Sequence, residues 1–411
     1  MASRSASAGW TELRLALANR EWRALFAAAL LSAMGDQLAR VALALIVYDR
    51  SGSAAQSALV FAVSFLPYLL GAALTDIGDR RPRRSVMLAC DLMRVVLAGA
   101  MTVPHLNLGL LLGLYFLLGL AEPPFEAARA ALAADLLGPE AYAAGHGLLQ
   151  SSFALVGGAG VLAAGVLVSA SGATTALLVN AATFAVSAAI IAARIHSGRE
   201  AASVDTQVSV AGGFRVIARS EMLRTVLSLA AGGAVLAIPV DVLAAPIAHG
   251  SGHGPAAASV LLAAPLLGAI ASSVLVTRVP AADRDRLMPR LAAASFVPLT
   301  LFAFQPGFIF VCVLAAVAGL FTGYQVLANQ RFMLAIAPED RSKTFGAASA
   351  ILMAGQGISA AVAGSVADYV EPERVVGFAG LMALGMTAYV GYALPRTGGH
   401  VAITDAAVMP A

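Results

Sequence analysis

Residues 139–165 read PEAYAAGHGLLQSSFALVGGAGVLAAG, and residues 338–364 read PEDRSKTFGAASAILMAGQGISAAVAG. The two stretches align without a gap at an offset of 199 residues, with the Pro-Glu pair in register. Agreement at several independent positions indicates a parallel internal duplication of the chain. Three further glycine pairs coincide in this alignment: Gly147 with Gly346, Gly158 with Gly357, and Gly165 with Gly364.

The composition of the whole chain places it in a lipid bilayer. Of its 411 residues, 59% are hydrophobic and only 12% are charged, whereas about a quarter of a soluble globular chain is charged. The net charge of +3 comes from arginines scattered between apolar runs. Because these arginines form no continuous basic face, a nucleic-acid partner is not expected.

Apolar runs long enough to cross a bilayer as helices recur along the chain. A hydrocarbon core of about 30 Å requires about 20 residues of helix. We count twelve such runs, which predicts an all-α polytopic membrane protein of two parallel six-helix repeats. The expected spans are 24–48, 55–77, 85–104, 107–128, 144–169, 173–194, 222–247, 255–277, 287–304, 307–330, 345–368 and 375–394.

The longest stretch between spans divides them six and six. It is rich in Ser, Gly and charged residues, as is typical of a linker followed by an amphipathic segment. One large loop without a duplication is the alternative, and the repeat argues against it. The expected units are a cytoplasmic segment 1–23, an N-terminal bundle 24–194, a cytoplasmic linker 195–221, a C-terminal bundle 222–394 and a cytoplasmic tail 395–411.

Basic residues predict the orientation of the spans, because they collect in cytoplasmic loops. Arg50 and Arg374 are the only basic residues in the loops expected on the exterior side, so both termini are expected in the cytoplasm. A single lysine, Lys343, among many arginines, alanines and glycines suggests a GC-rich bacterial gene and hence a bacterial inner (plasma) membrane. The basic residues of the predicted inner loops are Arg80, Arg81, Arg83, Arg84, Arg194, Arg199, Arg215, Arg219, Arg278, Arg284, Arg286, Arg290, Arg341 and Lys343.

Four local motifs narrow the prediction to a family. They are Gly35-Asp36-Gln37 with Arg40, Asp79-Arg80-Arg81-Pro82-Arg83-Arg84 with Asp91 and Arg94, Ala127-Ala128-Arg129 with Asp135, and the glycines of residues 157–165. Together with the duplicated twelve spans, they resemble the major facilitator superfamily. The branch that the motifs resemble contains macrolide-efflux proteins and the enterobactin exporter. The fifth-span glycines also suit close helix packing alone.

The resemblance implies a gating role for one group of charged residues. Carboxylates and arginines at helix ends can cap helix dipoles and pair between the halves, which would hold an inner gate shut. Positive charge that only sets the topology is the alternative. The family's arginine in the fourth span has no counterpart between Leu108 and Leu120, so its proton-relay role is not transferred. The expected gating residues are Asp79, Arg80, Arg83, Arg84, Asp91, Arg94 and Arg129.

Charged residues at bilayer depth are costly, so each is expected to have a partner or a function. Asp36 lies about twelve residues into the first span, roughly 18 Å from its inner end and near the midplane. It either carries the coupling proton or forms a structural ion pair with Arg40 at i+4. Glu122, which precedes two prolines, is the second proton-coupling candidate. A buried structural pair is expected between Asp91 and Arg94.

Five polar side chains are candidates for the lining of a substrate cavity: Gln37, Arg40, Gln150, Asn180 and Asp241. The chain contains no Walker glycine loop, no catalytic triad pattern and no HExxH motif. Its two cysteines lie in apolar runs without metal-ligand spacing. We therefore expect no enzyme activity, no cofactor and no metal.

These inferences predict a secondary transporter that acts as a monomer. Because the sequence has no nucleotide site, we expect an ion gradient to supply the energy, and an antiporter that couples proton entry to efflux by alternating access is the leading hypothesis. The resemblance implies an amphiphilic cargo of the drug, macrolide-like or siderophore-like kind and a role in multidrug resistance. An uptake permease for a small nutrient has the same fold and remains an alternative. A non-transporting membrane sensor is the alternative from another class.

Overall fold

A computed structural model provides the three-dimensional structure of the chain. The gating-motif residues Asp79 and Arg80 lie outside the residues that it describes. The described residues are 12, 14–70, 81–196, 210–276, 278–280, 283–337 and 340–397.

Helices form the described chain from end to end. In the N-terminal half, they are α2 (Arg20–Ser51), α3 (Ala54–Leu69), α5 (Arg83–Ala100), α6 (Leu108–Leu120), α7 (Glu122–Ser171) and α8 (Ala173–Arg194). After the linker helix α9 (Val210–Arg219), the C-terminal half comprises α10 (Glu221–Val242), α11 (Ala244–Gly250), α12 (Pro255–Val276), α13 (Arg284–Thr300), the 3-10 turn η2 (Leu301–Phe304), α14 (Phe308–Leu320), α15 (Gly323–Leu334), α16 (Arg341–Ala367) and α17 (Pro372–Thr397).

These helices make the predicted membrane crossings. Within the described ranges, ten helical stretches are long and apolar enough to span a bilayer. The short apolar helix α3 and the charged helix α5 complete twelve passes. The fourth pass begins with α6 and continues in α7 as far as Gly138, where φ is +64°, and the rest of α7 forms the fifth pass. The predicted all-α polytopic fold is therefore confirmed.

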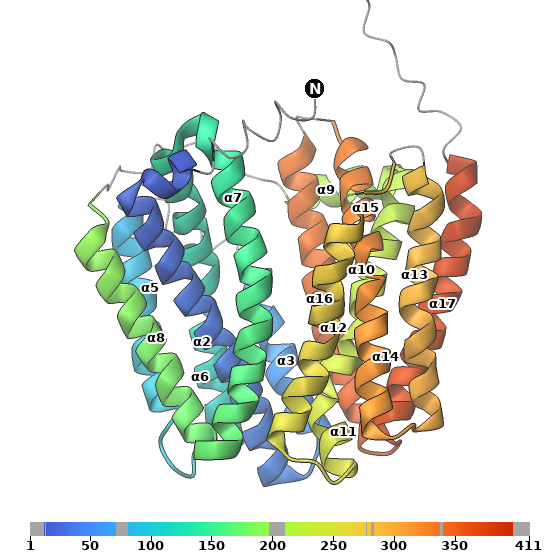
Figure 1. Cartoon of the computed structure of the whole chain (residues 1–411), viewed down its shortest axis with the longest axis horizontal. Coiled ribbons are helices and arrows are strands. Elements are labelled where there is room, and N and C mark those ends of the chain that lie inside the picture. Colours follow the sequence, from blue (N-terminus) through green and yellow to red (C-terminus); the bar gives the residue numbers. More distant parts are fainter. Residues whose placement is uncertain are drawn as a thin grey trace, which may run out of the picture.

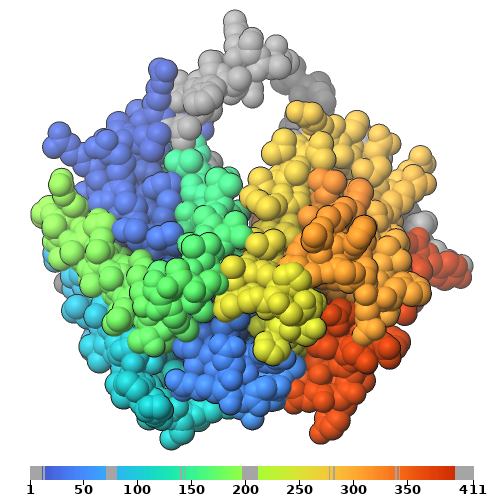
Figure 2. Space-filling view, turned by 60° about the horizontal axis from the view of Figure 1, so that its bottom comes forward, coloured from blue at the N-terminus to red at the C-terminus, as the bar shows by residue number. Residues whose placement is uncertain are grey.

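The two halves form separate bundles that meet at one end of the molecule (Figure 1). At the end from which the N-terminus leaves, the bundles stand apart. At the opposite end, α11 and the start of α12 lie close to α3 and to the end of α7. Figure 2 looks toward this second end and shows a continuous surface between the halves there. We call it the closed end, defined by Ser53, Ser169, Ala256 and Asp368.

Glycines of the internal repeat make the contacts between the halves. Gly165 of α7 packs against Ser259 and Ala256 of α12 so closely that a Cβ atom would collide with them. Gly364 of α16 packs equally closely against Ala58 of α3. Since the two glycines are related by the 199-residue offset, the two crossings are equivalent. Small residues let helix backbones approach in this way.

Within the C-terminal half, the crossing of α12 and α14 depends on another glycine. A Cβ atom on Gly268 would collide with backbone atoms of Ala316 and Leu320. Gly268→Ala should therefore lower the free energy of unfolding by about 1–3 kcal/mol, the usual cost of overpacking. Thermal unfolding in detergent measures the change.

A matched control for this substitution lies in α6. Apart from Gly113, its chain neighbours and the nearby backbone of its own helix, no described residue has an atom within 4 Å of the position that a Cβ on Gly113 would occupy. Gly113→Ala should therefore leave the unfolding midpoint unchanged or raise it, since alanine favours helix. Equal midpoints for the two variants would contradict the tight α12–α14 crossing.

Candidate functional site

A cavity of about 640 Å³ lies between the two halves. The N-terminal half contributes four helices to its wall, and the C-terminal half contributes α16. Both halves therefore change the shape of this cavity if they move relative to each other. Its lining residues are Asp36, Gln37, Arg40, Ser64, Phe65, Tyr68, Leu69, Tyr115, Leu118, Gly119, Glu122, Gly346, Ser349, Ala350 and Met353.

The two walls of this cavity differ in charge. The wall from the N-terminal half carries two carboxylates, Asp36 and Glu122, and one guanidinium, Arg40. The wall from α16 is made of small or neutral side chains, among them Ser349 and Met353. All ionisable groups in the described lining of the cavity therefore belong to one half.

Asp36 is held on the cavity wall by the packing of its own helix. The preceding residue, Gly35, is buried against α8, where a Cβ atom would collide with Thr183 and Asn180. This close crossing of α2 and α8 fixes the rotation of α2, and the next side chain, Asp36, lines the cavity. No hydrogen bond or ion pair joins the Asp36 carboxylate to any residue that the structure describes.

The expected ion pair between Asp36 and Arg40 is not formed. Arg40 instead donates a hydrogen bond to the side-chain carbonyl of Gln37. Its guanidinium lies 5.9 Å from the ring centroid of Phe61 and interacts electrostatically with Asp241 of the other half. The i+4 spacing permits the pair on one helix, but Arg40 faces the neighbouring helices.

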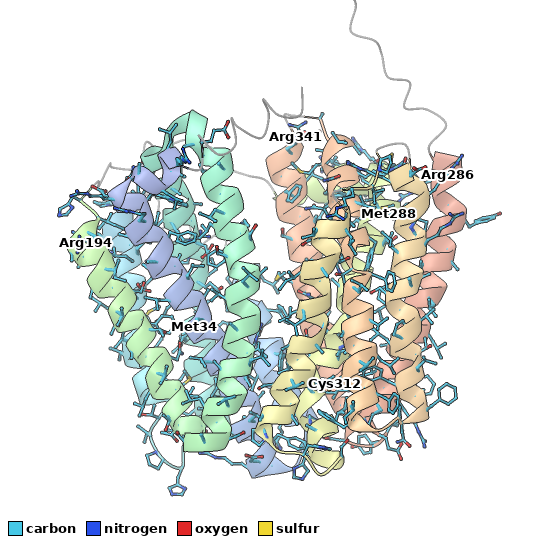
Figure 3. The ribbon with its side chains drawn as sticks, viewed as in Figure 1. Met34, Arg194, Arg286, Met288, Cys312 and Arg341 are labelled. Carbon is cyan, nitrogen blue, oxygen red and sulfur yellow. The ribbon has the colours of Figure 1, made fainter. Side chains whose placement is uncertain are left out.

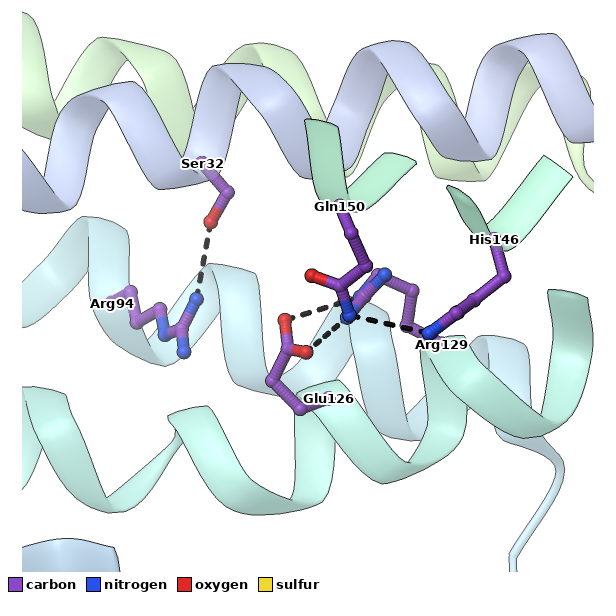
Figure 4. A network of polar contacts seen from close by, with 6 residues as sticks. All are labelled: Ser32, Arg94, Glu126, Arg129, His146 and Gln150. Atoms are coloured by element: carbon purple, nitrogen blue, oxygen red, sulfur yellow. Dashed lines mark hydrogen bonds and ion pairs between the residues drawn. The ribbon is translucent and has the colours of Figure 1, made fainter. Parts of the chain in front are cut away.

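Among the described cations, Arg94 of α5 is the one that interacts electrostatically with Asp36. Arg94 is only 1% exposed, and its guanidinium lies between the rings of Phe125 and Phe184, at 5.1 and 5.3 Å from their centroids. It donates a 3.1 Å hydrogen bond to Ser32 Oγ of α2 (Figure 4). It interacts electrostatically with the carboxylates of Asp36, Glu122 and Asp91. One buried cation thus interacts with three carboxylates, which come from three different helices.

Asp91 and Arg94 do not form the direct ion pair that their spacing predicted. No described atom pair joins them within 4.0 Å. Asp91 accepts a 2.6 Å hydrogen bond from Ser187 Oγ of α8 and is fully buried. Each charge is bonded to a serine of a different neighbouring helix, so the two residues connect α5 to α8 and to α2.

A second charged pair lies next to this cluster. Arg129 forms an ion pair with Glu126, and its guanidinium lies 5.0 Å from the ring centroid of Phe153 (Figure 4). Glu126 was missed by the sequence analysis. It lies one helical turn after Glu122 and three residues before Arg129, spacing that favours side-chain contact on a helix. That spacing was the available signal.

The remaining cavity candidates lie in three different surroundings. Gln150 is exposed and contacts His146 at 3.3 Å. Asn180 is fully buried against Gly35 and is not part of the lining of the central cavity. Asp241 lines a second cavity of about 360 Å³ within the C-terminal half.

The cavities adjoin one another through shared residues. A third cavity of about 300 Å³ shares Ser349 with the central cavity and Gln325 with the second one. Gln356 also lines the second cavity, and Asn329 lines the third. The neutral wall of the central cavity therefore leads to further space lined by amide side chains.

The described gating residues make contacts inside their own half. Arg83 forms an ion pair with Asp135 and donates a 3.0 Å hydrogen bond to the carbonyl of Ala131. Arg84 donates a 2.7 Å bond to the carbonyl of Ala192 at the end of α8. These bonds tie the start of α5 to α7 and α8. Contacts of these gating residues with the other half remain a prediction for a state in which the bundles meet at the end where they now stand apart.

The C-terminal half contains a comparable hydrogen bond at the start of one of its helices. Arg284, at the start of α13, donates a 3.1 Å hydrogen bond to Gln330 Oε1 of α15. Gln330 is the counterpart of Ala131 at the 199-residue offset. Arginines gather at this same end of the molecule, where Figure 3 labels Arg194, Arg286 and Arg341. The ties therefore lie at the end where the bundles stand apart.

Arg94 should be the residue of this cluster whose removal costs most. Arg94→Met leaves the carboxylates of Asp36, Glu122 and Asp91 without their buried cation, and removal of one partner from a buried charge pair costs about 3–5 kcal/mol. The thermal unfolding midpoint in detergent should fall strongly. Arg94→Lys keeps the charge but not the planar stacking between rings, so it should lose less.

The control for Arg94 is Arg286→Met at the exposed rim of α13. Loss of an exposed charge typically changes stability by less than about 0.5 kcal/mol. Equal midpoints for Arg94→Met and Arg286→Met would show that the carboxylate cluster does not depend on Arg94.

Solved structures of membrane transporters share this architecture at low sequence identity. A bacterial homologue of the human lysosomal transporter Spinster, in an inward-facing and occupied conformation, aligns with a TM-score of 0.74 and 13% identity, over 92% of this chain and 97% of that chain. A POT family transporter in complex with a thioalcohol-conjugated peptide gives 0.73 and 11%, over 92% and 96%. The nucleoside transporter NupG gives 0.66 and 14%, over 91% and 100%.

The sequence comparisons give the family. No curated protein matches the chain. The family model described as Major Facilitator Superfamily matches residues 25–282, which is more than half of the chain. With the two bundles, the cavity between them and the shared fold of transporters of known structure, this match identifies the protein as a membrane transporter that belongs to the Major Facilitator Superfamily.

Proposed function

We propose that the protein is a proton-coupled exporter of an amphiphilic small molecule of the drug, macrolide or siderophore kind. One observation carries this proposal. Two carboxylates from the middle of the N-terminal half, Asp36 and Glu122, line the cavity between the halves. The described residues provide no ion pair for either of them. Carboxylates in such a place are suited to exchange protons with water in the cavity.

Movement of the two halves would couple proton binding at these carboxylates to transport. Because helices of both halves line the cavity, rocking of the bundles about the closed end would expose it to the other side. A proton or a cargo molecule shifts this equilibrium only if it binds the two orientations with different affinity. Asp36 and Glu122 line a cavity whose opposite wall, α16, belongs to the other half, so a movement of the halves would change the surroundings of these carboxylates and supply such a difference.

The lining of the cavity favours an amphiphilic cargo. Phe65, Tyr68 and Tyr115 offer aromatic surface, and Met353 offers a deformable apolar contact. A volume of about 640 Å³ lies within the range of sites for drug-sized ligands. A sugar phosphate would instead favour clustered basic residues, and Arg40 is the one basic side chain in the described lining.

The orientation of the protein in the membrane sets the direction of transport. With the predicted cytoplasmic termini and a bacterial inner membrane, the end at which the bundles stand apart faces the cytoplasm. The structure then corresponds to the state that would accept cargo from inside the cell. The closed end faces the exterior.

Loss of the cavity carboxylates should abolish coupled transport. Asp36→Asn and Glu122→Gln keep the size of each side chain but remove its exchangeable charge. Efflux of a fluorescent amphiphilic drug from energised cells should fall at least about tenfold in one of these variants, as expected when a proton-coupling group is lost. Membrane levels of the protein should stay normal, and a protonophore should stop efflux by the unchanged protein.

Asp283→Asn is the matched control, because Asp283 is exposed at the start of α13 and lies outside the cavities. It should transport like the unchanged protein. Normal, protonophore-sensitive efflux from the double variant of Asp36 and Glu122 would refute their coupling role. Drug accumulation in place of efflux would instead assign the protein as an uptake permease.

A further inference from the structure

The closed end contains two hydrogen-bonded contacts between the halves that occupy equivalent places in the repeat. At one of them, Asp368 of the C-terminal half accepts hydrogen bonds from Ser53 Oγ at 2.8 Å and from the backbone N–H of Ala55 at 3.2 Å. At the other, Ser169 Oγ of the N-terminal half accepts a 3.0 Å hydrogen bond from the backbone N–H of Ala256.

The repeat relates these contacts residue by residue. Ser169 and Asp368 differ by the 199 residues that relate Gly165 to Gly364. In both cases, the acceptor lies one helical turn after the glycine that lets the two halves approach. In both cases, the donor is the second residue of the opposing helix, α3 or α12.

The chemistry of both contacts is that of a helix N-cap. The first N–H groups of a helix have no acceptor within it, and a side-chain oxygen that accepts from them stabilises the helix. Here the capping oxygen comes from the other half of the protein. The cap therefore exists only while the halves touch at this end.

The two caps differ in strength because only one is charged. A carboxylate stabilises the N-terminus of a helix through the macrodipole as well as through its hydrogen bonds. Asp368 follows the last residue of its own helix, α16, where a negative charge is unfavourable. The favourable interaction of Asp368 is thus the one with α3 of the other half.

Ser53 extends this cap into α3. Its hydroxyl donates to Asp368 and accepts a 3.2 Å hydrogen bond from the backbone N–H of Gln56. The carboxylate of Asp368 is therefore linked to two backbone N–H groups of α3, to that of Ala55 directly and to that of Gln56 through Ser53. The Ser169 contact has no second bond of this kind among the described residues.

We propose that Asp368 and Ser169 are paired latches that hold the closed end shut, and that Asp368 is the stronger of the two. Opening of this end breaks both caps. Removal of either cap favours the open arrangement, because it destabilises only the closed one. This role is independent of the cargo and of the coupling ion.

Thiol labelling tests the latches without any substrate. Ala245 of α11 is 9% exposed and lines a small space between the halves, together with Ala258 of α12. In purified protein with Cys90 and Cys312 replaced by alanine, an Ala245→Cys reporter reacts with a bulky water-soluble maleimide when this end opens. The rate of labelling then measures the open population, even where that population is small.

Asp368→Ala should accelerate labelling about fivefold, the usual effect of losing an N-cap. Ser169→Ala should accelerate it about twofold to threefold, because one uncharged bond is lost. Asp368→Ser makes the two latches alike and should fall between the unchanged protein and Asp368→Ala.

Two controls separate this effect from damage to the fold. Glu371→Ala removes a nearby carboxylate whose ion pair, with Arg374, lies within its own half, and it should leave labelling unchanged. A reporter at Ala292→Cys, which is fully buried in α13, should stay unreactive in all variants. Unchanged labelling of Ala245→Cys in Asp368→Ala, or equal acceleration by Glu371→Ala or at Ala292→Cys, would overturn the proposal.

Discussion

The close backbone approach of the two halves at one end of the molecule is the constraint on which the rest of the structure depends. Gly165 and Gly364 leave no room for a Cβ atom where α7 meets α12 and where α16 meets α3. Without a strong hydrophobic force between helices in lipid, such packing and the hydrogen bonds that it permits are what hold membrane helices together. The caps at Asp368 and Ser169 come within reach only because of these crossings.

This contact at one end leaves space between the halves elsewhere. The central cavity lies between helices that converge at the closed end and diverge from it. Because equivalent helices of the repeat make the contacts, the proposed rocking of the halves about them would require little change inside each bundle. The ties at Arg83 and Arg284, which lie within their own halves, keep each bundle intact during such a movement.

The halves share a fold but not a chemistry. In the N-terminal half, Arg94 lies between two aromatic rings and serves carboxylates from three helices. In the C-terminal half, the wall of the cavity is formed by small and neutral residues of α16. The family's arginine has no counterpart between Leu108 and Leu120, and in this protein Arg94 of α5 is a fully buried cation. The duplicated fold thus places the charged residues of the cavity wall in the N-terminal half and neutral residues in the C-terminal half.

The sequence by itself determined the fold class and the internal duplication, because the length of apolar runs and the spacing of glycines are local properties that the bilayer makes decisive. It also singled out Asp36 and Glu122, since charge within an apolar run is rare and costly. The partners of these charges were decided by the tertiary structure. Arg40 is close to Asp36 along the helix, yet Arg94, far away in sequence, is the described cation that interacts electrostatically with it.

The same distinction holds at the closed end. No motif in the sequence singles out Asp368 or Ser169. Only the crossing of the halves brings them to the N-termini of α3 and α12. Glu126 follows Glu122 by one turn and pairs with Arg129 on the same helix, a contact that the spacing of three residues favours by itself. Periodicity along one helix is encoded locally, whereas contacts between helices depend on how each helix is rotated, and that rotation is fixed only by all of its neighbours together.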